Sequence, residues 1–352
     1  MLIDIYNRQL SCHKEFEFYC FKNNCRIVLE YYGIKNAKYF INCSLDFRLL
    51  RDTSFKLGYK NVRMTDIQSV IGNCPLVKNS NKVLLHKECK SEALGVWIEN
   101  KKKIDTGLPL IVFMDLFNLS YNPIFKNKEH GLHSVILAGY TTGSEKPLIL
   151  DWYQHHWSYK PEMELEEYLE ARKSDNPLGV NVASGMPIHN AWVEINREGW
   201  DSEDYELLSR TLDLTLDQYY GLSDNNEVLK GIDALKAIYE ACTAYLRNTD
   251  EKTEVFFREL YISTFMLAKN KSLFKWYMDA ASYEFANMGI KDASILLNDI
   301  STSWNTLLLL ICKCSMAYSY ELHKRIADLI LECIHLEEKL YDCLCSIKSK
   351  II

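Results

Sequence analysis

The sequence predicts an α+β fold, with an antiparallel sheet and a packed helix in the first half and a helical bundle in the second. One amphipathic helix begins at Cys20, and three apolar runs between residues 108 and 153 have the length and composition of strands. After residues 196–208, nearly every segment repeats its apolar residues with a helical period. We therefore expect two domains, residues 1–195 with the sheet and residues 196–352 as an all-α bundle.

The helix and the strands of the first half follow from their apolar periods. The segment "CFKNNCRIVLEYYG" places Cys25, Val28, Leu29 and Tyr32 on one stripe, and Gly33 is a typical helix stop. The run "LPLIVFMDL" is nearly continuous in apolar residues, which favours a buried strand. "HSVILAGY" and "PLILDWY" flank the turn-forming "TTGSEK", so together they predict a β-hairpin with a loop of about six residues.

The second half is predicted to be helical almost throughout. Its last segment keeps seven apolar residues on one broad stripe, namely Leu322, Ile326, Leu329, Ile330, Cys333, Leu336 and Leu340. The apolar repeats predict helices within residues 224–248, 251–269, 272–288, 291–315 and 318–346. Helices of this kind bury their stripes against one another, which predicts a bundle.

Composition and charge argue against several classes of function. The net charge of −6 gives no reason to expect a nucleic-acid partner. The most apolar run, "TLLLLIC", is far shorter than the ~20 residues of a membrane span, so no membrane association is expected. No basic start followed by an apolar block opens the sequence, so the twelve cysteines are expected to be reduced thiols of a cytoplasmic protein. Their spacing lacks the paired C-x-x-C of zinc sites, so no metal is expected.

Two residues of the predicted hairpin, His133 and Asp151, are candidates for a catalytic pair. A turn centred near Thr142 would place them opposite each other on one face, with Cβ atoms about 4.5–5.5 Å apart. The midpoint of the loop lies nearer Gly143, and a one-residue slip would separate the two residues onto opposite faces. The sequence therefore permits the pair without fixing it, and His130 in the preceding polar loop is an alternative base.

The predicted helix offers a thiol to this pair. Cys20 lies at the helix start, where unpaired amides and the helix dipole lower the pKa of a thiol. Cys25 lies on the apolar stripe, and we interpret it as a core residue. A thiol on a helix, with an imidazole and a carboxylate on the following sheet, is an arrangement of nucleophilic catalysis. The candidate catalytic residues are thus Cys20, His133 and Asp151.

Four segments of the first half form a pattern known from one family. They are "CFKNNCRIVLEYYG", "IVFMDLFNLSYNP", "HSVILAGY" and "LILDW". Through them, roughly the first 160 residues resemble the N-terminal domain of the butirosin-biosynthesis acyltransferase family, papain-like proteins of antibiotic pathways. The resemblance implies a papain-like first domain and places Cys20, His133 and Asp151 on the catalytic positions of the family. It continues more weakly into the second half, at "SWNTLLLL".

The resemblance implies an enzyme, a cysteine acyltransferase that forms an amide bond. An acyl group would arrive as a thioester on the phosphopantetheine of an acyl or peptidyl carrier protein. It would pass to Cys20 and leave on a small amine, such as a diamine or an amino sugar. No other cofactor is implied, which agrees with the absence of a G-x-G motif from the sequence. The alternatives are a papain-like peptidase or thioesterase that uses water, and an inert module that binds a carrier protein.

Further residues are candidates for substrate binding. Asp115 ends the buried strand and would bind the second nitrogen of the amine, and its alternative role is to cap the following turn. Tyr121 would line the site or pack in the core. Asn23 and Asn24 are candidates for the second oxyanion donor, beside the backbone N–H of Cys20. Five lysines are candidates for docking an acidic carrier protein, namely Lys101, Lys102, Lys103, Lys126 and Lys128. The alternative is that they are ordinary solvated side chains.

Overall fold

The chain folds into two compact units in the computed structural model. The first unit comprises Met1–Ile41 and Met64–Asp201, and the second comprises Asn42–Arg63 and Ser202–Ile352. The division after Asp201 lies close to the expected boundary after residue 195, whereas residues 42–63, expected in the first domain, belong to the second unit. The structure describes residues 1–9, 13–40, 47–51, 59–61, 67, 82–86, 92–153, 156–179, 181–200, 202–221, 228–246 and 252–351.

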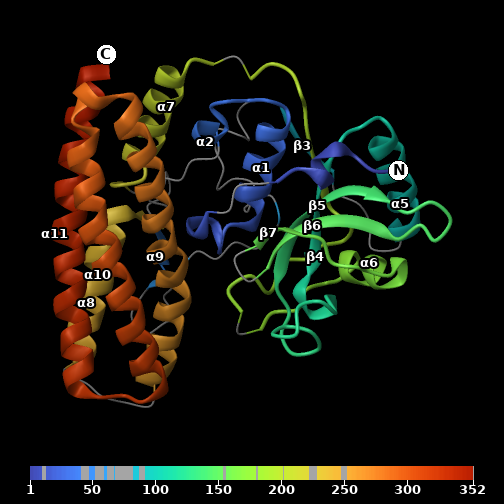
Figure 1. The fold of residues 1–352 in the computed structure, drawn as a ribbon. Coiled ribbons are helices and arrows are strands. Elements are labelled where there is room, and N and C mark those ends of the chain that lie inside the picture. The colour runs from blue at the N-terminus through green and yellow to red at the C-terminus, as the bar shows by residue number, and fades with distance from the viewer. Residues whose placement is uncertain are drawn as a thin grey trace. The chain divides into compact units, whose positions relative to one another are not determined.

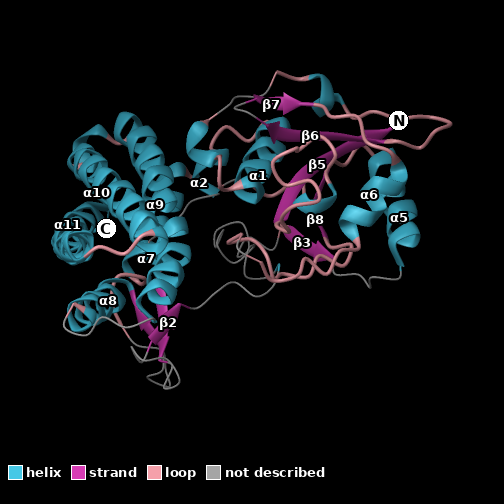
Figure 2. Cartoon of the chain, turned by 90° about the horizontal axis from the view of Figure 1, so that it is seen from below, coloured by secondary structure: helices cyan, strands magenta, loops and turns pink. Residues whose placement is uncertain are grey.

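The first unit is built around one antiparallel sheet (Figure 1). Its strand order is β3 (Val83–His86), β8 (Trp192–Ile195), β4 (Leu110–Asp115), β5 (Leu132–Tyr140), β6 (Pro147–Tyr153) and β7 (His156–Tyr159). Two helices lie on each side of this sheet in Figure 2: α1 (Cys20–Tyr31) and α2 (Ala37–Phe40) on one, α5 (Ala93–Asp105) and α6 (Leu165–Arg172) on the other. Strand β4 is buried at all six positions, as expected for a strand covered on both faces.

The antiparallel sheet that the sequence predicts is confirmed, together with its hairpin. The segments predicted at 133–140 and 147–153 are β5 and β6, and the run at 108–116 contains β4. Helix α1 ends before Gly33, whose φ of +86° is a left-handed conformation that favours glycine. Strands β3, β7 and β8 were not predicted, because four residues are too few to show a period.

The second unit is mostly helical. Its helices are α7 (Asp204–Leu216), α8 (Gly231–Tyr245), α9 (Lys252–Glu284), α10 (Ile290–Met316) and α11 (Tyr320–Ile351). A small antiparallel sheet, in the order β2-β1-β9, joins β2 (Tyr59–Asn61), β1 (Arg48–Arg51) and β9 (Val228–Lys230). The prediction of an all-α second domain is therefore wrong in this respect, because the strand β1 from the first part of the chain pairs with a segment predicted as helix.

Two helix boundaries differ from the prediction. The apolar pattern places Val228 in a helix, but this residue begins β9, and α8 starts at Gly231. Gly231 has a φ of +48°, and a Cβ there would lie 2.3 Å from the Gln218 carbonyl oxygen, so the turn requires glycine. Residues 252–284, predicted as two helices, form one helix, since no glycine or proline interrupts them. Residues 224–227, 247–248 and 251 of the predicted helices lie outside the described residues.

A buried ion pair joins the helices of the second unit. Lys271 Nζ lies 2.7 Å from Glu337 Oε1, and the two side chains are 1% and 0% exposed. The Trp304 Nε1–H donates to Oε1 at 2.9 Å, and the Tyr219 O–H donates to Oε2 at 3.0 Å. Burial lowers the pKa of Lys271, while the charge and hydrogen bond of Glu337 oppose this shift. The carboxylate thus ties together α9, α10, α11 and the turn after α7.

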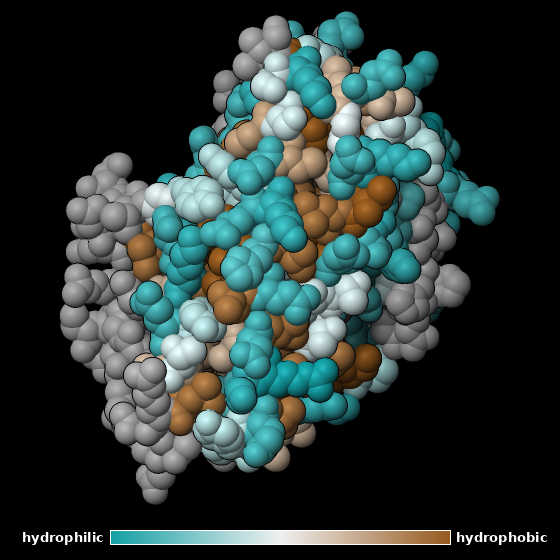
Figure 3. All heavy atoms as spheres, turned by 90° about the vertical axis from the view of Figure 1, so that its left-hand side faces the viewer, coloured by the Kyte–Doolittle hydropathy of each residue, from teal (hydrophilic) through white to brown (hydrophobic). Residues whose placement is uncertain are grey.

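Helix α10 is long and apolar enough to cross a membrane, judged by length and composition alone. The core helix of a soluble protein passes the same test. Eleven residues of α10 are buried, among them Trp304, which donates to Glu337 as described above. On the face drawn in Figure 3, apolar side chains are interspersed with hydrophilic ones. Within this structure α10 therefore serves as a packed helix of the bundle.

Removing one partner of the buried ion pair is expected to destabilise the second unit strongly. Lys271→Met leaves the Glu337 charge buried without its cation, which should lower the free energy of unfolding by about 3–5 kcal/mol. Adding Glu337→Gln removes that charge, while the amide oxygen can accept from Trp304 and the amide nitrogen can donate to the Tyr219 hydroxyl oxygen. The double variant should therefore recover most of the loss, as measured by denaturant unfolding.

The matched control is Lys236→Met, which breaks a pair with Glu338, the neighbour of Glu337 on α11. These two side chains are 48% and 35% exposed, so the loss should stay below about 1 kcal/mol. Equal losses in the two lysine variants would contradict a special role for the buried pair.

Candidate functional site

A β-bulge in the β5–β6 hairpin brings His133 and Asp151 to the same face. The Cα partners on the two sides of the bulge are Gly139 with Leu148, and Leu137 with Ile149. Ala138 is therefore the extra residue on β5. Continued to the next residues, the register beyond the bulge sets Asp151 opposite Val135, which is two residues from His133 and on the same face.

This arrangement differs from the directly opposed pair considered from the sequence. The register on the turn side of the bulge, if continued, would set Asp151 opposite Ile136. His133 and Asp151 would then lie on opposite faces, because side chains alternate along a strand. The single extra residue is thus what allows the two side chains to meet.

Asp151 holds the imidazole of His133 in one orientation. His133 Nε2 lies 2.7 Å from Asp151 Oδ1, and the two side chains are 15% and 3% exposed. The Tyr121 O–H donates to Oδ2 at 2.7 Å, and the Trp152 N–H donates to Oδ1 at 2.6 Å. Since Nε2 is bound to the carboxylate, Nδ1 is the ring nitrogen left for a thiol. Tyr121, expected to line the site or to pack, donates this hydrogen bond to the aspartate.

Cys20 is the first residue of α1 and is half-buried, and hydrogen bonding and the charge of His133 lower the pKa of its thiol. The N–H of Asn23 makes the first helical hydrogen bond, to the Tyr19 carbonyl oxygen at 2.9 Å. The N–H groups of Cys20 and of the next two residues precede this bond, so they add positive potential at the helix start. The structure thus brings together all three residues predicted to be catalytic.

The pKa values of the thiol and the imidazole shift in opposite directions. Burial raises the pKa of Cys20, but the His133 hydrogen bond and charge, with hydrogen bonds from Ser134, outweigh it and hold the pKa below its ordinary 9.0. Burial lowers the pKa of His133, but the charge and hydrogen bond of Asp151, and those of Cys20, raise it well above 6.5. Both shifts act in the same sense, since each favours the thiolate–imidazolium form of the pair over the neutral form.

Ser134 is a residue of this site that the sequence analysis missed. It follows His133 on β5 and is buried, and its side chain and main chain both hydrogen-bond to Cys20. Asn24 Nδ2 donates to the Ser134 carbonyl oxygen at 2.9 Å and to its Oγ at 3.0 Å. The one signal in the sequence is a polar residue inside an apolar strand, directly after the candidate base.

Asn23 and Asn24, the candidates for the second oxyanion donor, are both buried in α1. The amide nitrogen of Asn24 is committed to Ser134, as described above. Asn23 Oδ1 accepts from Arg26 Nε at 3.2 Å and Nη2 at 2.9 Å, and Arg26 pairs with Glu30 at 2.7 Å. Asn23 Nδ2 has no hydrogen-bond partner among the described residues. Of the two side chains, Asn23 is therefore the one that retains a donor.

Asp115 is held by partners of its own and not by the Cys20 group. It ends β4 and is fully buried, and its Oδ1 accepts from the N–H groups of Phe117 and Gly131 at 3.1 Å each. Oδ2 lies 2.7 Å from His130 Nδ1 and accepts from the Ser174 O–H at 2.5 Å. These four contacts favour the turn-capping alternative over a group that binds the amine. They also tie His130, the alternative base, to this second carboxylate.

The five lysines considered for docking a carrier protein are mostly engaged within the chain. Lys101 and Lys103 form ion pairs with glutamates, at 2.5 and 2.8 Å. Lys126 and Lys128 each donate to a main-chain oxygen at 2.8 Å. Lys102 is exposed and has no such contact within the described ranges. A preformed basic patch is therefore not evident from these residues.

No metal site among the described residues and no similar protein of known function indicates what this site does. In the part of the chain that the structure describes, no group of three His, Cys, Asp or Glu side chains could hold a metal ion. The eight described cysteines are free thiols, and the other four lie outside the described residues: Cys12, Cys43, Cys74 and Cys89. No protein-family model and no curated protein matches the sequence. The contacts of Cys20 are therefore what indicates the chemistry of the site.

Cys20 is expected to react with iodoacetamide at a pH where ordinary thiols are protonated, because the thiolate is the reactive form. His133→Ala removes the strongest stabilising partner of the thiolate, so the rate near neutral pH should fall by about tenfold or more. The measurement is the pH–rate profile of alkylation, followed by mass spectrometry of tryptic peptides.

Trypsin separates the two cysteines of α1, since Cys20 lies in residues 15–22 and Cys25 in residues 23–26. Cys25 is fully buried and serves as an internal control that should label slowly in both proteins. An unchanged profile in the His133→Ala protein would contradict the thiolate–imidazolium pair.

Asp151→Asn should raise the pKa of the Cys20 thiol, because it removes the charge that keeps His133 protonated. We expect alkylation at neutral pH to slow by about tenfold. Asp115→Asn is the matched control, since it disturbs the other buried His–Asp contact of the same sheet without touching Cys20. If the two variants shift the pH–rate profile equally, the effect is one of general stability and Asp151 has no special role.

Proposed function

We propose that this chain is a papain-like cysteine acyltransferase, with Cys20 as nucleophile, His133 as proton carrier and Asp151 as the residue that orients it. One observation carries the proposal: the thiol of Cys20, at a helix start, interacts with an imidazole that a buried carboxylate holds at 2.7 Å. A thiolate beside an imidazolium attacks acyl carbon atoms. The chain order of the three residues, and the packing of α1 on an antiparallel sheet, support a papain-like arrangement of residues 1–195.

The proposed reaction consists of two acyl transfers. First, the Cys20 thiolate attacks the carbonyl carbon of a thioester, the carbon–sulfur bond to the donor breaks, and His133 gives its proton to the departing thiolate. Next, a neutral amine attacks the acyl-enzyme and His133 accepts a proton from its nitrogen. The bond to Cys20 Sγ then breaks, which yields an amide and restores the thiolate–imidazolium pair.

Each step passes through an oxyanion that needs hydrogen-bond donors. The backbone N–H of Cys20 is one donor we propose, since it precedes the first hydrogen bond of α1. The side-chain amide of Asn23 is a candidate for a second donor, because its Nδ2 is buried with no partner in the described part of the chain. Tyr121 and Ser134 act through Asp151 and Cys20, so we propose them as positioning residues.

The proposed donor is an acyl group on the phosphopantetheine of an acyl or peptidyl carrier protein, and the proposed acceptor is a small amine such as a diamine or amino sugar. Both come from the resemblance of the sequence motifs. Asp115 no longer supports the acceptor, because its oxygens are already bound by four partners. Transfer to an amine, rather than to water, therefore needs a direct test.

An acyl N-acetylcysteamine thioester, which imitates the end of a phosphopantetheine arm, provides that test. Incubation should add the acyl mass to the tryptic peptide of residues 15–22. Cys20→Ala should abolish the adduct, and Cys25→Ala, on the same helix, should retain it. Addition of 1,3-diaminopropane should then release the acyl group as an amide.

The other outcomes identify the alternatives. Release of the free acid at the same rate with and without the amine would indicate a peptidase or thioesterase that uses water. Absence of any adduct on the unaltered protein, between about pH 6 and 9, would contradict catalysis and favour a module that binds a carrier protein.

A further inference from the structure

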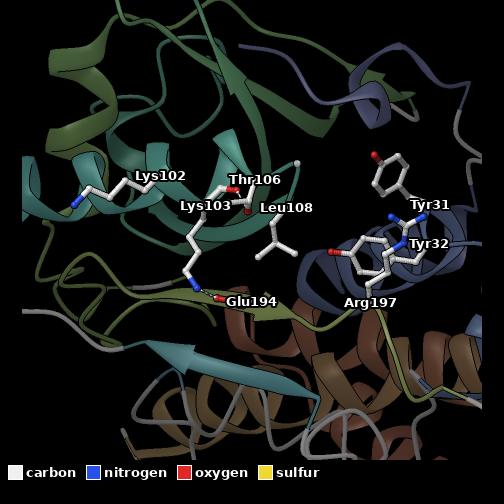
Figure 4. Close-up of a pocket in the computed structure, with 9 residues that line it drawn as sticks. Tyr31, Tyr32, Lys102, Lys103, Thr106, Leu108, Glu194 and Arg197 are labelled. Carbon is white, nitrogen blue, oxygen red and sulfur yellow. Dashed lines mark hydrogen bonds and ion pairs between the residues drawn. The ribbon is translucent and has the colours of Figure 1, made fainter.

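A separate cavity lies at the other end of α1 from Cys20. It has a volume of about 440 Å³, within the range of small-molecule sites. Figure 4 shows its principal lining residues, Tyr31, Tyr32, Lys103, Leu108, Glu194 and Arg197. Because α1 runs from Cys20 to Tyr31 and rises 1.5 Å per residue, the cavity lies about 16 Å from Cys20 along the helix axis. It is therefore not part of the thiol site.

Among the described residues, one cation that faces this cavity has no partner. Lys103 Nζ lies 2.8 Å from Glu194, so these two charges neutralise each other. Lys102 extends away from the other lining residues in Figure 4. Arg197 is exposed beside Tyr32, and no hydrogen bond or ion pair joins it to another described residue. A free guanidinium presents a planar fork of donors that suits a carboxylate or a phosphate.

The wall beside Arg197 is aromatic and apolar. The rings of Tyr31 and Tyr32 lie 5.6 Å apart at an angle of 46°. The Tyr32 O–H donates to the Ile195 carbonyl oxygen at 3.1 Å, which fixes the position of that ring. Leu108 projects into the space between these tyrosines and Lys103 (Figure 4). A ligand would therefore meet one cation and an apolar surface together.

We propose that this cavity binds a small organic anion, a carboxylate or a phosphate ester with an aromatic body. The anionic group would accept two hydrogen bonds from the Arg197 guanidinium, and the body would pack against Tyr31, Tyr32 and Leu108. The chain as a whole has a net charge of −6, so the attraction is local to this site. The proposal does not depend on any reaction at Cys20.

The test is equilibrium binding of benzoate and of phenyl phosphate to the full chain, measured by calorimetric titration or ligand-observed NMR. Benzyl alcohol and benzylamine are the uncharged and cationic controls, and both should bind at least tenfold more weakly. Arg197→Gln should weaken binding of the anions by about tenfold or more. Arg210→Gln, which changes another exposed arginine on α7, is the matched control and should leave it unchanged.

The two anions distinguish a carboxylate site from a phosphate site, and tighter binding of either supports the proposal. Cys20→Ser should bind the better anion with unchanged affinity, so this result stands or fails independently of the acyltransferase. The proposal is overturned if neither anion binds, if benzylamine binds as tightly as benzoate, or if Arg197→Gln binds like the unaltered protein.

Discussion

The extra residue at Ala138 is the constraint on which the candidate site depends, because it decides which face of the sheet Asp151 reaches. A bulge leaves main-chain groups without ladder partners, and such groups must be satisfied elsewhere. Here the N–H of Ile3 donates to the Ala138 carbonyl oxygen at 2.9 Å, and Leu2 forms an antiparallel bridge with Gly139. A Cβ on Gly139 would lie 2.5 Å from the Met1 carbonyl oxygen. The segment at residues 1–3 therefore stabilises the register that the site requires.

Strand β5 positions the thiol as well as the base. Its pairing with β6 reaches Ile136, so Ser134 lies beyond the paired part of that edge. Its main chain bonds to α1 instead, to Cys20 and to the Asn24 amide. The open edge of the strand is thereby used to hold the start of the helix. Phe21 adds a stacked contact with Phe113 of β4, with ring centroids 5.7 Å apart, so α1 is fixed to two adjacent strands.

The sequence was sufficient for those elements whose apolar period is long. Helix α1 could be predicted from its helical period, and strands β5 and β6 from apolar runs that flank a turn-forming segment. The bulge could not be predicted, because the local sequence is compatible with either strand register. The register depends on the pairing of β5 with Leu2, which is far away in the chain. Strand β9 could not be predicted either, because it also depends on a distant partner, the strand β1. The role of Ser134 likewise exists only after α1 has docked.

Two buried aspartates of the first unit, Asp115 and Asp151, each bind a histidine at 2.7 Å, and their surroundings explain why we assign chemistry to one of them. Asp115 also receives two main-chain N–H groups and the Ser174 hydroxyl, and its histidine, His130, stacks on Phe117 at 4.2 Å. Those contacts close a loop, and no thiol takes part in them. Asp151 leaves one nitrogen of His133 for Cys20, at a helix start that favours negative charge. A histidine near an aspartate in the sequence therefore has little predictive value by itself. The third residue, and the strand register that lets it approach, separates a reactive group from a structural one.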